Sequence, residues 1–231
     1  METDQRNARI FGVLFVVTFL TAIPALALFQ PVLDDPAGYI AGDGKDSQIY
    51  LGVLLELFLI IANIGTAVVV FPILRRQNEI LALGYVTARI VESVFIAAGV
   101  IAVLGIVSLR QDSPDAADLA VSLAAIKDWT FLLGPGFIVG WGNGLILGYL
   151  MYRSGLVPRQ MAMLGLIGGP VLVFAGIGVL FGWWDAGGTV QSLATIPEFI
   201  WELSLGIYAA VWGFRRSSPV LTDEARRAIR T

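Results

Sequence analysis

The sequence contains no histidine and no cysteine in its 231 residues. Imidazole and thiolate groups are common protein ligands of zinc, copper, haem iron and di-iron centres, so any such centre would lack them here. A serine hydrolase triad would lack its histidine base, and no disulfide framework can form. We therefore expect no cofactor and no metal site, and the sequence argues against an enzyme.

Charged residues are also scarce. They make up 14% of the chain, whereas hydrophobic residues make up 57%, and the mean hydropathy is +0.79. Soluble domains have about 45–50% apolar and about 25% charged residues, so a soluble fold could not cover this much apolar surface. We expect an integral membrane protein whose main partner is the lipid bilayer, with no nucleic-acid partner.

Long apolar runs separated by short polar connectors organise the chain. A membrane-spanning helix needs roughly 20 residues, and backbone groups in lipid must bond within the segment, which favours helices. The sequence therefore predicts an all-α, single-domain bundle of six transmembrane helices over residues 1–231, with a short tail over 215–231. The runs are Ile10–Phe29, Gln48–Leu74, Ile80–Leu109, Asp128–Tyr152, Met161–Trp184 and Ile196–Phe214.

Three further interpretations concern lysine, the longest connector and the first run. No lysine lies within a run, which excludes a retinal Schiff base. The connector DDPAGYIAGDGKD is interpreted as solvated turn residues.

The first run has Arg6 and Arg9 before it and Ala25-Leu26-Ala27 near its end, as in a signal peptide. Its apolar stretch is longer than the usual 7–15 residues or so, and we expect it to be retained.

The basic residues indicate the orientation, because cytoplasmic connectors carry an excess of lysine and arginine. Lys45, Arg110 and Lys127 fall in the other connectors, and Arg89 lies within a run. This alternation predicts that both termini are cytoplasmic. The remaining basic residues are at the N-terminus, the second and fourth connectors and the tail: Arg6, Arg9, Arg75, Arg76, Arg153, Arg159, Arg215, Arg216, Arg226, Arg227 and Arg230. The predicted outer face is acidic: Asp34, Asp35, Asp43, Asp46, Asp112, Asp115, Asp118 and Asp185.

The start of the last run contains the sequence TIPE. Thr195 and Glu198 have the spacing of a capping box, and Pro197 would sit in the first turn. We therefore predict that the last helix begins here and that Glu198 is a capping residue at the outer surface.

Glycines indicate how the helices pack. The fourth run contains Gly136, Gly140, Gly144 and Gly148 at strict four-residue spacing. Such a stripe allows close approach of a second helix, and the fifth run, with glycines at the same spacing, is the predicted partner. Gly134-Pro135-Gly136 and Gly168-Gly169-Pro170 are expected to kink or break their helices.

Several polar residues fall deep inside the runs. Because a helix rises about 1.5 Å per residue, their depth follows from the centre of each run. Ionisable side chains near the bilayer centre cost about 2.5–3.5 kcal/mol on insertion scales and suggest functional sites. Those within roughly 8 Å of the predicted midplane are Glu56, Asn63, Arg89, Glu92, Asn143 and Glu202.

The spacing of these residues indicates that their side chains face one region inside the bundle. Glu56 and Asn63 are two helical turns apart, and Tyr85, Arg89 and Glu92 follow an i, i+4, i+7 pattern on one stripe. One arginine then faces three glutamates, so at least one carboxyl group must hold a proton, reach water or bind a cation. We predict a polar cavity that opens outward on the side of Glu56 and Glu202. The alternative is structural: an Arg89–Glu92 pair fixing helix register, with asparagines bonding between helices.

Three segments carry a family resemblance: TDQRNARIFGVLF, LGVLLELFLIIANIGTAVVVFPILRRQNE and GPGFIVGWGNGLILGYLMYRSGLVPRQMAMLGLIGGP. The most specific part is Gly144–Arg159. Over essentially its whole length the chain resembles the bacterial membrane family catalogued as domain of unknown function 4386. The resemblance implies a six-helix protein of the bacterial inner membrane and carries no mechanism.

Two classes of function follow. The first is binding or transport of a small or lipidic molecule in the midplane cavity, with Glu56, Glu92 and Glu202 as proton or cation sites and Arg89 as counter-ion. The second is a non-catalytic membrane subunit or partner protein whose buried charges only hold the helices together. Neither class requires a homo-oligomer.

Overall fold

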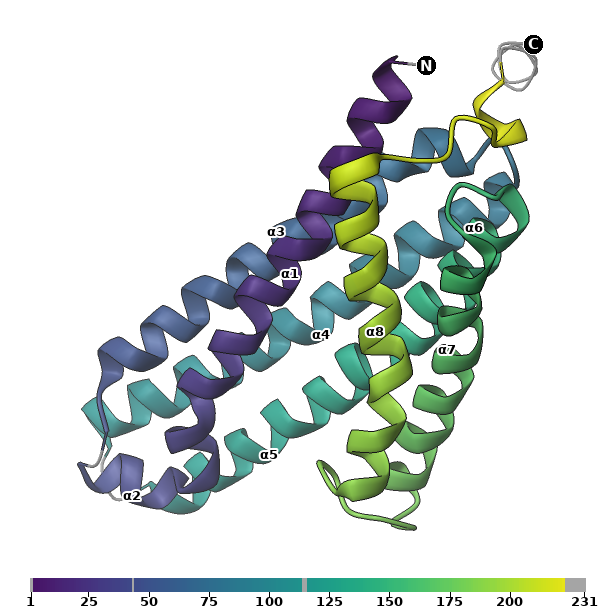
Figure 1. Cartoon of the computed structure of the whole chain (residues 1–231). Coiled ribbons are helices and arrows are strands. Elements are labelled where there is room, and N and C mark those ends of the chain that lie inside the picture. The colour runs from purple at the N-terminus through teal and green to yellow at the C-terminus, as the bar shows by residue number, and fades with distance from the viewer. Residues whose placement is uncertain (1, 43, 114–115, 223–231) are drawn as a thin grey trace.

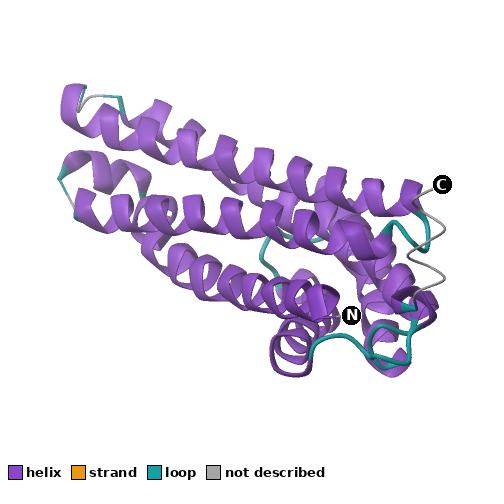
Figure 2. Ribbon diagram, turned by 90° about the horizontal axis from the view of Figure 1, so that it is seen from above, coloured by secondary structure: helices purple, strands orange, loops and turns teal. Residues whose placement is uncertain are grey.

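The structure is a computed structural model that describes residues 2–42, 44–113 and 116–222. Every regular element in these residues is a helix, and no strand occurs among them (Figure 2). The predicted all-α class is thus confirmed. The helices in chain order are α1 Glu2–Asp34, α2 Pro36–Ala41, α3 Asp46–Leu74, α4 Glu79–Asp112, α5 Ala117–Leu133, the π-helices η1 Gly134–Ile138 and η2 Gly140–Leu147, α6 Gly148–Ser154, α7 Arg159–Leu180, α8 Thr189–Trp212 and the 3₁₀ turn η3 Pro219–Leu221.

Five helical segments are long and apolar enough to cross a membrane. They are α1, α3, α4, the continuous stretch Ala117–Ser154 and α7. By length and composition the chain is thus a membrane-embedded protein. The last long helix, α8, has 24 residues but carries Glu198 and Glu202 and does not belong to this group.

The fourth run begins earlier than predicted. Its helix starts at Ala117 and continues through π-helical turns to Ser154, so Lys127 lies within it. Lys127 is buried, and the expectation that no lysine lies in a span was wrong. The reason is an amphipathic first part: Ala120, Ala124 and Lys127 follow helical spacing and are buried, while exposed Asp118 and Ser122 lower the average hydropathy.

The last long helix also begins earlier than predicted, at Thr189 rather than Ile196. The Thr195 hydroxyl donates to the Gln191 carbonyl 2.9 Å away, as a residue inside a helix does. Glu198 lies more than two turns into α8 and is only 2% exposed. The predicted capping box and the surface position of Glu198 were therefore wrong.

The longest connector contains a short helix rather than only solvated turns. The Asp35 carboxylate caps α2 by accepting from the Gly38 amide at 2.9 Å. Tyr39 is buried, donates to Asp46 at 2.6 Å and lies beneath the Arg110 guanidinium, 4.6 Å from the ring centroid. Burial and the bond to Asp46 raise the pKa of Tyr39 to about 12. This connector is thus a structured cap on its end of the bundle.

The two described ends of the chain lie at the other end of the bundle (Figure 1). Asp4 in α1 pairs with Arg76, which follows α3, at 2.9 Å. The Gln5 side chain donates to the Phe214 carbonyl at 2.7 Å, and the Arg215 amide donates to the Leu156 carbonyl at 2.8 Å. The α3–α4 and α6–α7 connectors therefore share this end with both described ends. The predicted basic tail lies mostly outside the described residues.

Helices α1 and α8 meet near the termini and separate toward α2 (Figure 1). A Cβ atom at Gly12 would lie 2.1 Å from the Ala210 nitrogen, and one at Gly206 would lie 2.9 Å from Phe15 Cβ, so the two backbones touch here. The buried hydrophobic residues form two clusters. One, near the termini, includes Phe11, Phe15, Val70, Tyr85 and Trp201, and the other, near α2, includes Phe29, Ile49, Val53, Val103 and Ala124.

The predicted glycine–proline distortions have different outcomes. Around Gly134-Pro135-Gly136 the chain leaves the α-helix and forms η1 and η2. Proline lacks an amide hydrogen and glycine is a weak helix former, which explains the wider turns. In contrast, α7 stays α-helical through Gly168-Gly169-Pro170, so the helix is not broken there, and the alternative of a kink stays a prediction.

Candidate functional site

Polar residues fill the layer between the two hydrophobic clusters. On α3 they lie between Val53 and Ala67, and on α4 between Tyr85 and Val100. Glu56, Asn63, Arg89 and Glu92 are all buried, with exposed fractions of 7% or less. These four predicted site residues thus occupy one layer inside the bundle.

Glu56 pairs with a residue that the sequence interpretation placed in a connector. The Lys127 ammonium donates to both Glu56 oxygens at 2.6 Å and lies 4.9 Å from the centroid of the Phe29 ring. Gly99 of α4 gives the lysine room, because a Cβ atom there would lie 2.8 Å from Lys127 Cδ. Among the described residues the interior therefore holds Lys127 as well as Arg89, and the expectation that Arg89 alone faces the glutamates was wrong.

Asn63, Arg89 and Glu92 form a second network. Arg89 donates to Glu92 at 2.6 Å and to the Asn63 side-chain oxygen, and the Asn63 amide donates to Glu92 at 3.0 Å. The Arg89 guanidinium also lies 5.5 Å from the Phe15 ring centroid. The triad therefore links α3, through Asn63, to Arg89 and Glu92 on α4. Tyr85, one turn away, is 3.4 Å from the Thr66 hydroxyl.

Glu202 and Asn143 form a third group, between α8 and η2. The Asn143 amide donates to Glu202, and the Trp201 indole donates to the Asn143 carbonyl at 2.9 Å. The side-chain oxygen of Asn143 is buried and has no hydrogen-bond partner in the described part of the chain. No basic side chain among the described residues forms an ion pair with Glu202.

Glu198 has an unusual environment. Both of its carboxyl oxygens are buried, and neither has a hydrogen-bond partner within residues 2–42, 44–113 and 116–222. A Cβ atom at Gly144 or at Gly168 would lie 2.9 Å from one of these oxygens. The carboxyl group therefore occupies a niche that only residues without a side chain leave open. Burying an ionised carboxylate without a partner is costly, so this group calls for a proton or a cation.

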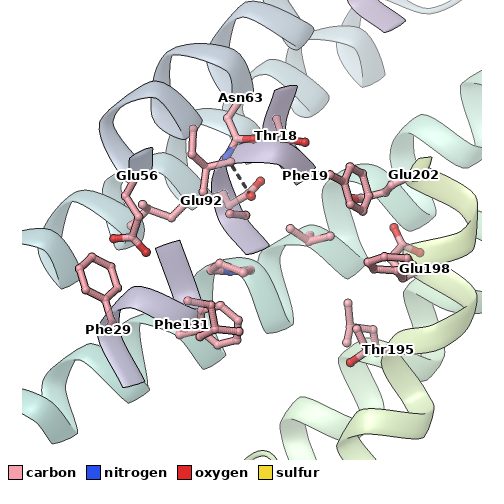
Figure 3. Close-up of a pocket in the computed structure, with 18 of the residues that line it drawn as sticks. Thr18, Phe19, Phe29, Glu56, Asn63, Glu92, Phe131, Thr195, Glu198 and Glu202 are labelled. Atoms are coloured by element: carbon pink, nitrogen blue, oxygen red, sulfur yellow. Dashed lines mark hydrogen bonds between the residues drawn. The ribbon is translucent and has the colours of Figure 1, made fainter. Parts of the chain in front are cut away.

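A pocket of about 230 Å³ connects the three groups. Figure 3 shows Glu56, Asn63 and Glu92 on one side of it and Glu198 and Glu202 on the other. Tyr85 and Asn143 are not among its lining residues, although both were predicted site residues. The ionisable groups that line the pocket are Glu56, Arg89, Glu92, Lys127, Asp128, Glu198 and Glu202.

A second cavity, of about 480 Å³, adjoins the first. Both are lined by Asp128, Phe131, Pro135, Leu172 and Thr195. The second cavity also includes Gly187 of the α7–α8 connector, at the end of the bundle opposite the described termini. The polar pocket thus has a neighbouring space that leads toward that end.

The glycine stripe separates into two kinds of position. Cβ atoms at Gly140 and Gly144 would lie 2.7 and 2.4 Å from backbone atoms of Gly169 on α7. One at Gly148 would lie 3.2 Å from the Leu166 nitrogen. At Gly136 the nearest atom is the Phe131 oxygen at 3.5 Å, an ordinary contact. Three of the four glycines therefore face α7, and Gly136 does not.

Lys127 and Glu198 were missed, but their periodicity carries a signal. Lys127 continues a buried stripe with Ala120 and Ala124 on α5. Glu198 continues one with Ala194 and Leu205 on α8. Both spacings follow the helical repeat, so a charged residue within an apolar stripe was the available sign.

The comparisons with known proteins give one result for nearly the whole chain. Curated proteins and solved structures give no match. A family profile described as "Domain of unknown function (DUF4386)" matches residues 10–213, which confirms the resemblance inferred from the sequence. The chain belongs to this family.

Proposed function

We propose that this protein crosses the bacterial inner membrane six times, with both termini cytoplasmic, and binds or transports a small or lipidic molecule in its polar pocket. The distribution of Arg6, Arg9, Arg75, Arg76 and Arg153 on one side supports the orientation, since cytoplasmic connectors are rich in arginine. The α2 end, with Asp34, Asp35 and Asp46, is the outer face in this proposal.

The observation that carries the binding function is Glu198, a residue that lines the pocket and whose buried carboxyl group has no hydrogen-bond partner among the described residues. A polar group that served only to hold helices together would have a partner, as buried polar groups in proteins generally do. The pocket combines such a group with mostly apolar walls, the usual composition of small-molecule sites. Its volume of about 230 Å³ is below the roughly 300–1,000 Å³ of sites for drug-sized ligands, so the ligand is small.

Access from the bilayer is supported by an aromatic pair on α1 and α8. Phe19 and Phe199 both line the pocket and pack edge to face, with ring centroids 5.1 Å apart, between these two helices. Phe199 is 41% exposed and also lines the pocket, so rotation of these rings would open the pocket toward the outer surface of the bundle. A molecule dissolved in the membrane would then reach the polar layer sideways.

The alternative is a non-catalytic subunit or partner protein. It is favoured by the complete pairing of Glu56 with Lys127 and of Arg89 with Asn63 and Glu92, which would suffice to fix helix register. This alternative gives Glu198 no role, and the experiment on the pocket below separates the two.

The topology is tested by labelling, because the chain has no native cysteine. Single cysteines replace Ser47, Ala186 and Ser217, all exposed positions in or near connectors. We expect a membrane-impermeant maleimide to label Ser47→Cys and Ala186→Cys in intact cells, and Ser217→Cys only after lysis. Labelling of Ala186→Cys and Ser217→Cys from the same side would mean that α8 does not cross the membrane.

Binding is tested by native mass spectrometry of protein extracted from the membrane in which it was made. Ala22 lines the pocket, whereas Ala27 on the same helix is exposed and lies outside it. We expect a small-molecule or lipid adduct on the wild type and on Ala27→Phe, and its loss from Ala22→Phe, where the ring fills the pocket. Equal adducts on both variants, or none on the wild type, would refute binding in this pocket.

A further inference from the structure

Acidic residues outnumber basic residues in the wall of the pocket. Two basic residues line it, and each is taken by one carboxylate: Lys127 by Glu56 and Arg89 by Glu92. Three acidic residues remain without an ion pair in the described part of the chain: Asp128, Glu198 and Glu202. Asp128 is exposed, so the buried excess is concentrated on α8.

Glu198 and Glu202 are one helical turn apart and therefore lie on the same face of α8. Among the described residues, Glu202 accepts a hydrogen bond only from the neutral Asn143 amide, and Glu198 accepts none. Two carboxyl groups this close repel each other when both are ionised. A positive group bound beside the two carboxylates would remove their mutual repulsion. It would also give each buried carboxylate a partner of opposite charge.

The rest of the wall near α8 is apolar and aromatic. Phe19 and Phe199 line the pocket beside the two glutamates, and Phe131 and Leu26 extend the apolar surface along α5 and α1. Aromatic faces attract ammonium groups through their quadrupole. A strongly hydrated metal ion gains little from such a wall, whereas an organic cation gains from both the carboxylates and the rings.

We propose that the ligand of this pocket is a small amphipathic organic cation, with an amine or quaternary ammonium group against Glu198 and Glu202 and an apolar group against Phe19 and Phe199. This assignment rests on the proposed binding function and narrows it to one class of molecule. The volume of the pocket suits such a molecule, since an engineered cavity of about 150 Å³ holds benzene. A pocket of about 230 Å³ then accommodates one ring with a compact ammonium group.

The probe is benzyltrimethylammonium, and its matched neutral analogue is neopentylbenzene, which has the same shape with carbon in place of nitrogen. The readout is the thermal unfolding midpoint of purified protein in detergent, followed by tryptophan fluorescence over a series of probe concentrations. A ligand that binds only the folded state raises this midpoint in a concentration-dependent way. Glu198→Gln is the test variant, and Glu79→Gln, which alters an exposed carboxylate outside the pocket, is the control.

We expect the ammonium probe to raise the midpoint of the wild type and of Glu79→Gln, and to do so more than the neutral analogue. In Glu198→Gln the apparent affinity for the cation should fall about tenfold or more, since a buried charge pair is lost, while the response to the neutral analogue is unchanged. Glu202→Gln should also lower the apparent affinity for the cation. It serves as a second test variant in case Glu198→Gln fails to fold.

The failures are distinguishable. If the two probes stabilise the protein equally and Glu198→Gln changes neither response, the pocket binds small molecules but the cationic class is wrong. If neither probe changes the unfolding midpoint of the wild type, the cationic class is refuted, and the adduct comparison of Ala22→Phe with Ala27→Phe decides separately whether the pocket binds another small molecule.

Discussion

The Lys127 ammonium on α5 donates to both carboxylate oxygens of Glu56 on α3 at 2.6 Å, inside the bundle and with neither side chain more than 9% exposed. No other ionic contact recorded in the described residues joins these two helices. Removing one member of a buried pair leaves the other without compensation, which typically costs about 3–5 kcal/mol. Lys127→Met should therefore lower the free energy of unfolding by about this amount, measured by denaturant titration in detergent.

The double variant Lys127→Met with Glu56→Met removes both charges and should recover most of the loss, because well-packed apolar residues can replace a buried ion pair. Lys45→Met, at an exposed position beside α3, is the control and should have little effect. A double variant as unstable as the single one would show that the pair is not the source of the loss.

The sequence predicted the helical class well, and five of the six predicted spans lie in segments that are apolar enough to cross a membrane, because each has a long run of apolar residues. It failed at the start of α5, where Asp118, Ser122 and Lys127 interrupt the apolar residues. Only the spacing of Ala120 and Ala124 marks that part as a buried helical face. Average hydropathy thus hid a segment that periodicity would have revealed.

Partner choice was harder to predict than burial. The depth estimate placed Asn63, Arg89 and Glu92 at similar levels, and the three side chains are buried and contact one another. It could not show that Glu56 pairs with Lys127 or that Glu198 has no partner. Those facts depend on which helices are neighbours and on the space that Gly144 and Gly168 leave beside Glu198. The spacing of residues along a single helix does not specify either of them.

Substitutions along the glycine stripe should differ in their effect. At Gly144 an added methyl group would lie 2.4 Å from the Gly169 Cα atom, and backbone cannot move aside cheaply. Gly144→Ala should lower the free energy of unfolding by about 1–3 kcal/mol or more. Gly136→Ala, where the nearest atom is 3.5 Å away, should be neutral or stabilising by up to about 1 kcal/mol, since alanine favours helix.

Denaturant titration of the two variants measures this difference. Gly84→Ala on α4, whose nearest atom is a flexible Ile146 carbon at 3.6 Å, is the matched control and should behave like Gly136→Ala. Equal losses at Gly136 and Gly144 would mean that the stripe responds to helix propensity and that close packing on α7 is not the cause.

The cap formed by α2 should titrate at alkaline pH. Burial and the bond to Asp46 raise the pKa of Tyr39 to about 12, so the folded protein keeps this proton where an unfolded tyrosine, with a pKa of about 10, loses it. The stabilisation is therefore complete below about pH 10 and is lost as the pH rises through about 12. The difference in phenolate absorbance between the wild type and Tyr39→Phe reports this titration.

Asp46→Asn tests the cause of that shift, because it removes the negative charge on the acceptor while Arg110 stays in place. The pKa of Tyr39 should then fall toward its ordinary value. A difference titration centred near pH 10 in the wild type would show that Tyr39 is not held as the structure indicates.

The same substitution at two buried glutamates should have different effects on the free energy of unfolding. Glu56→Met leaves the buried Lys127 ammonium without its partner and should cost about 3–5 kcal/mol. Glu198→Met replaces a carboxyl group that has no hydrogen-bond partner among the described residues, and such a change is nearly neutral or stabilising. Denaturant titration of both variants in the same detergent gives the comparison. If Glu198→Met were as destabilising as Glu56→Met, Glu198 would be a structural residue, and its place at the wall of the pocket would need no ligand to explain it.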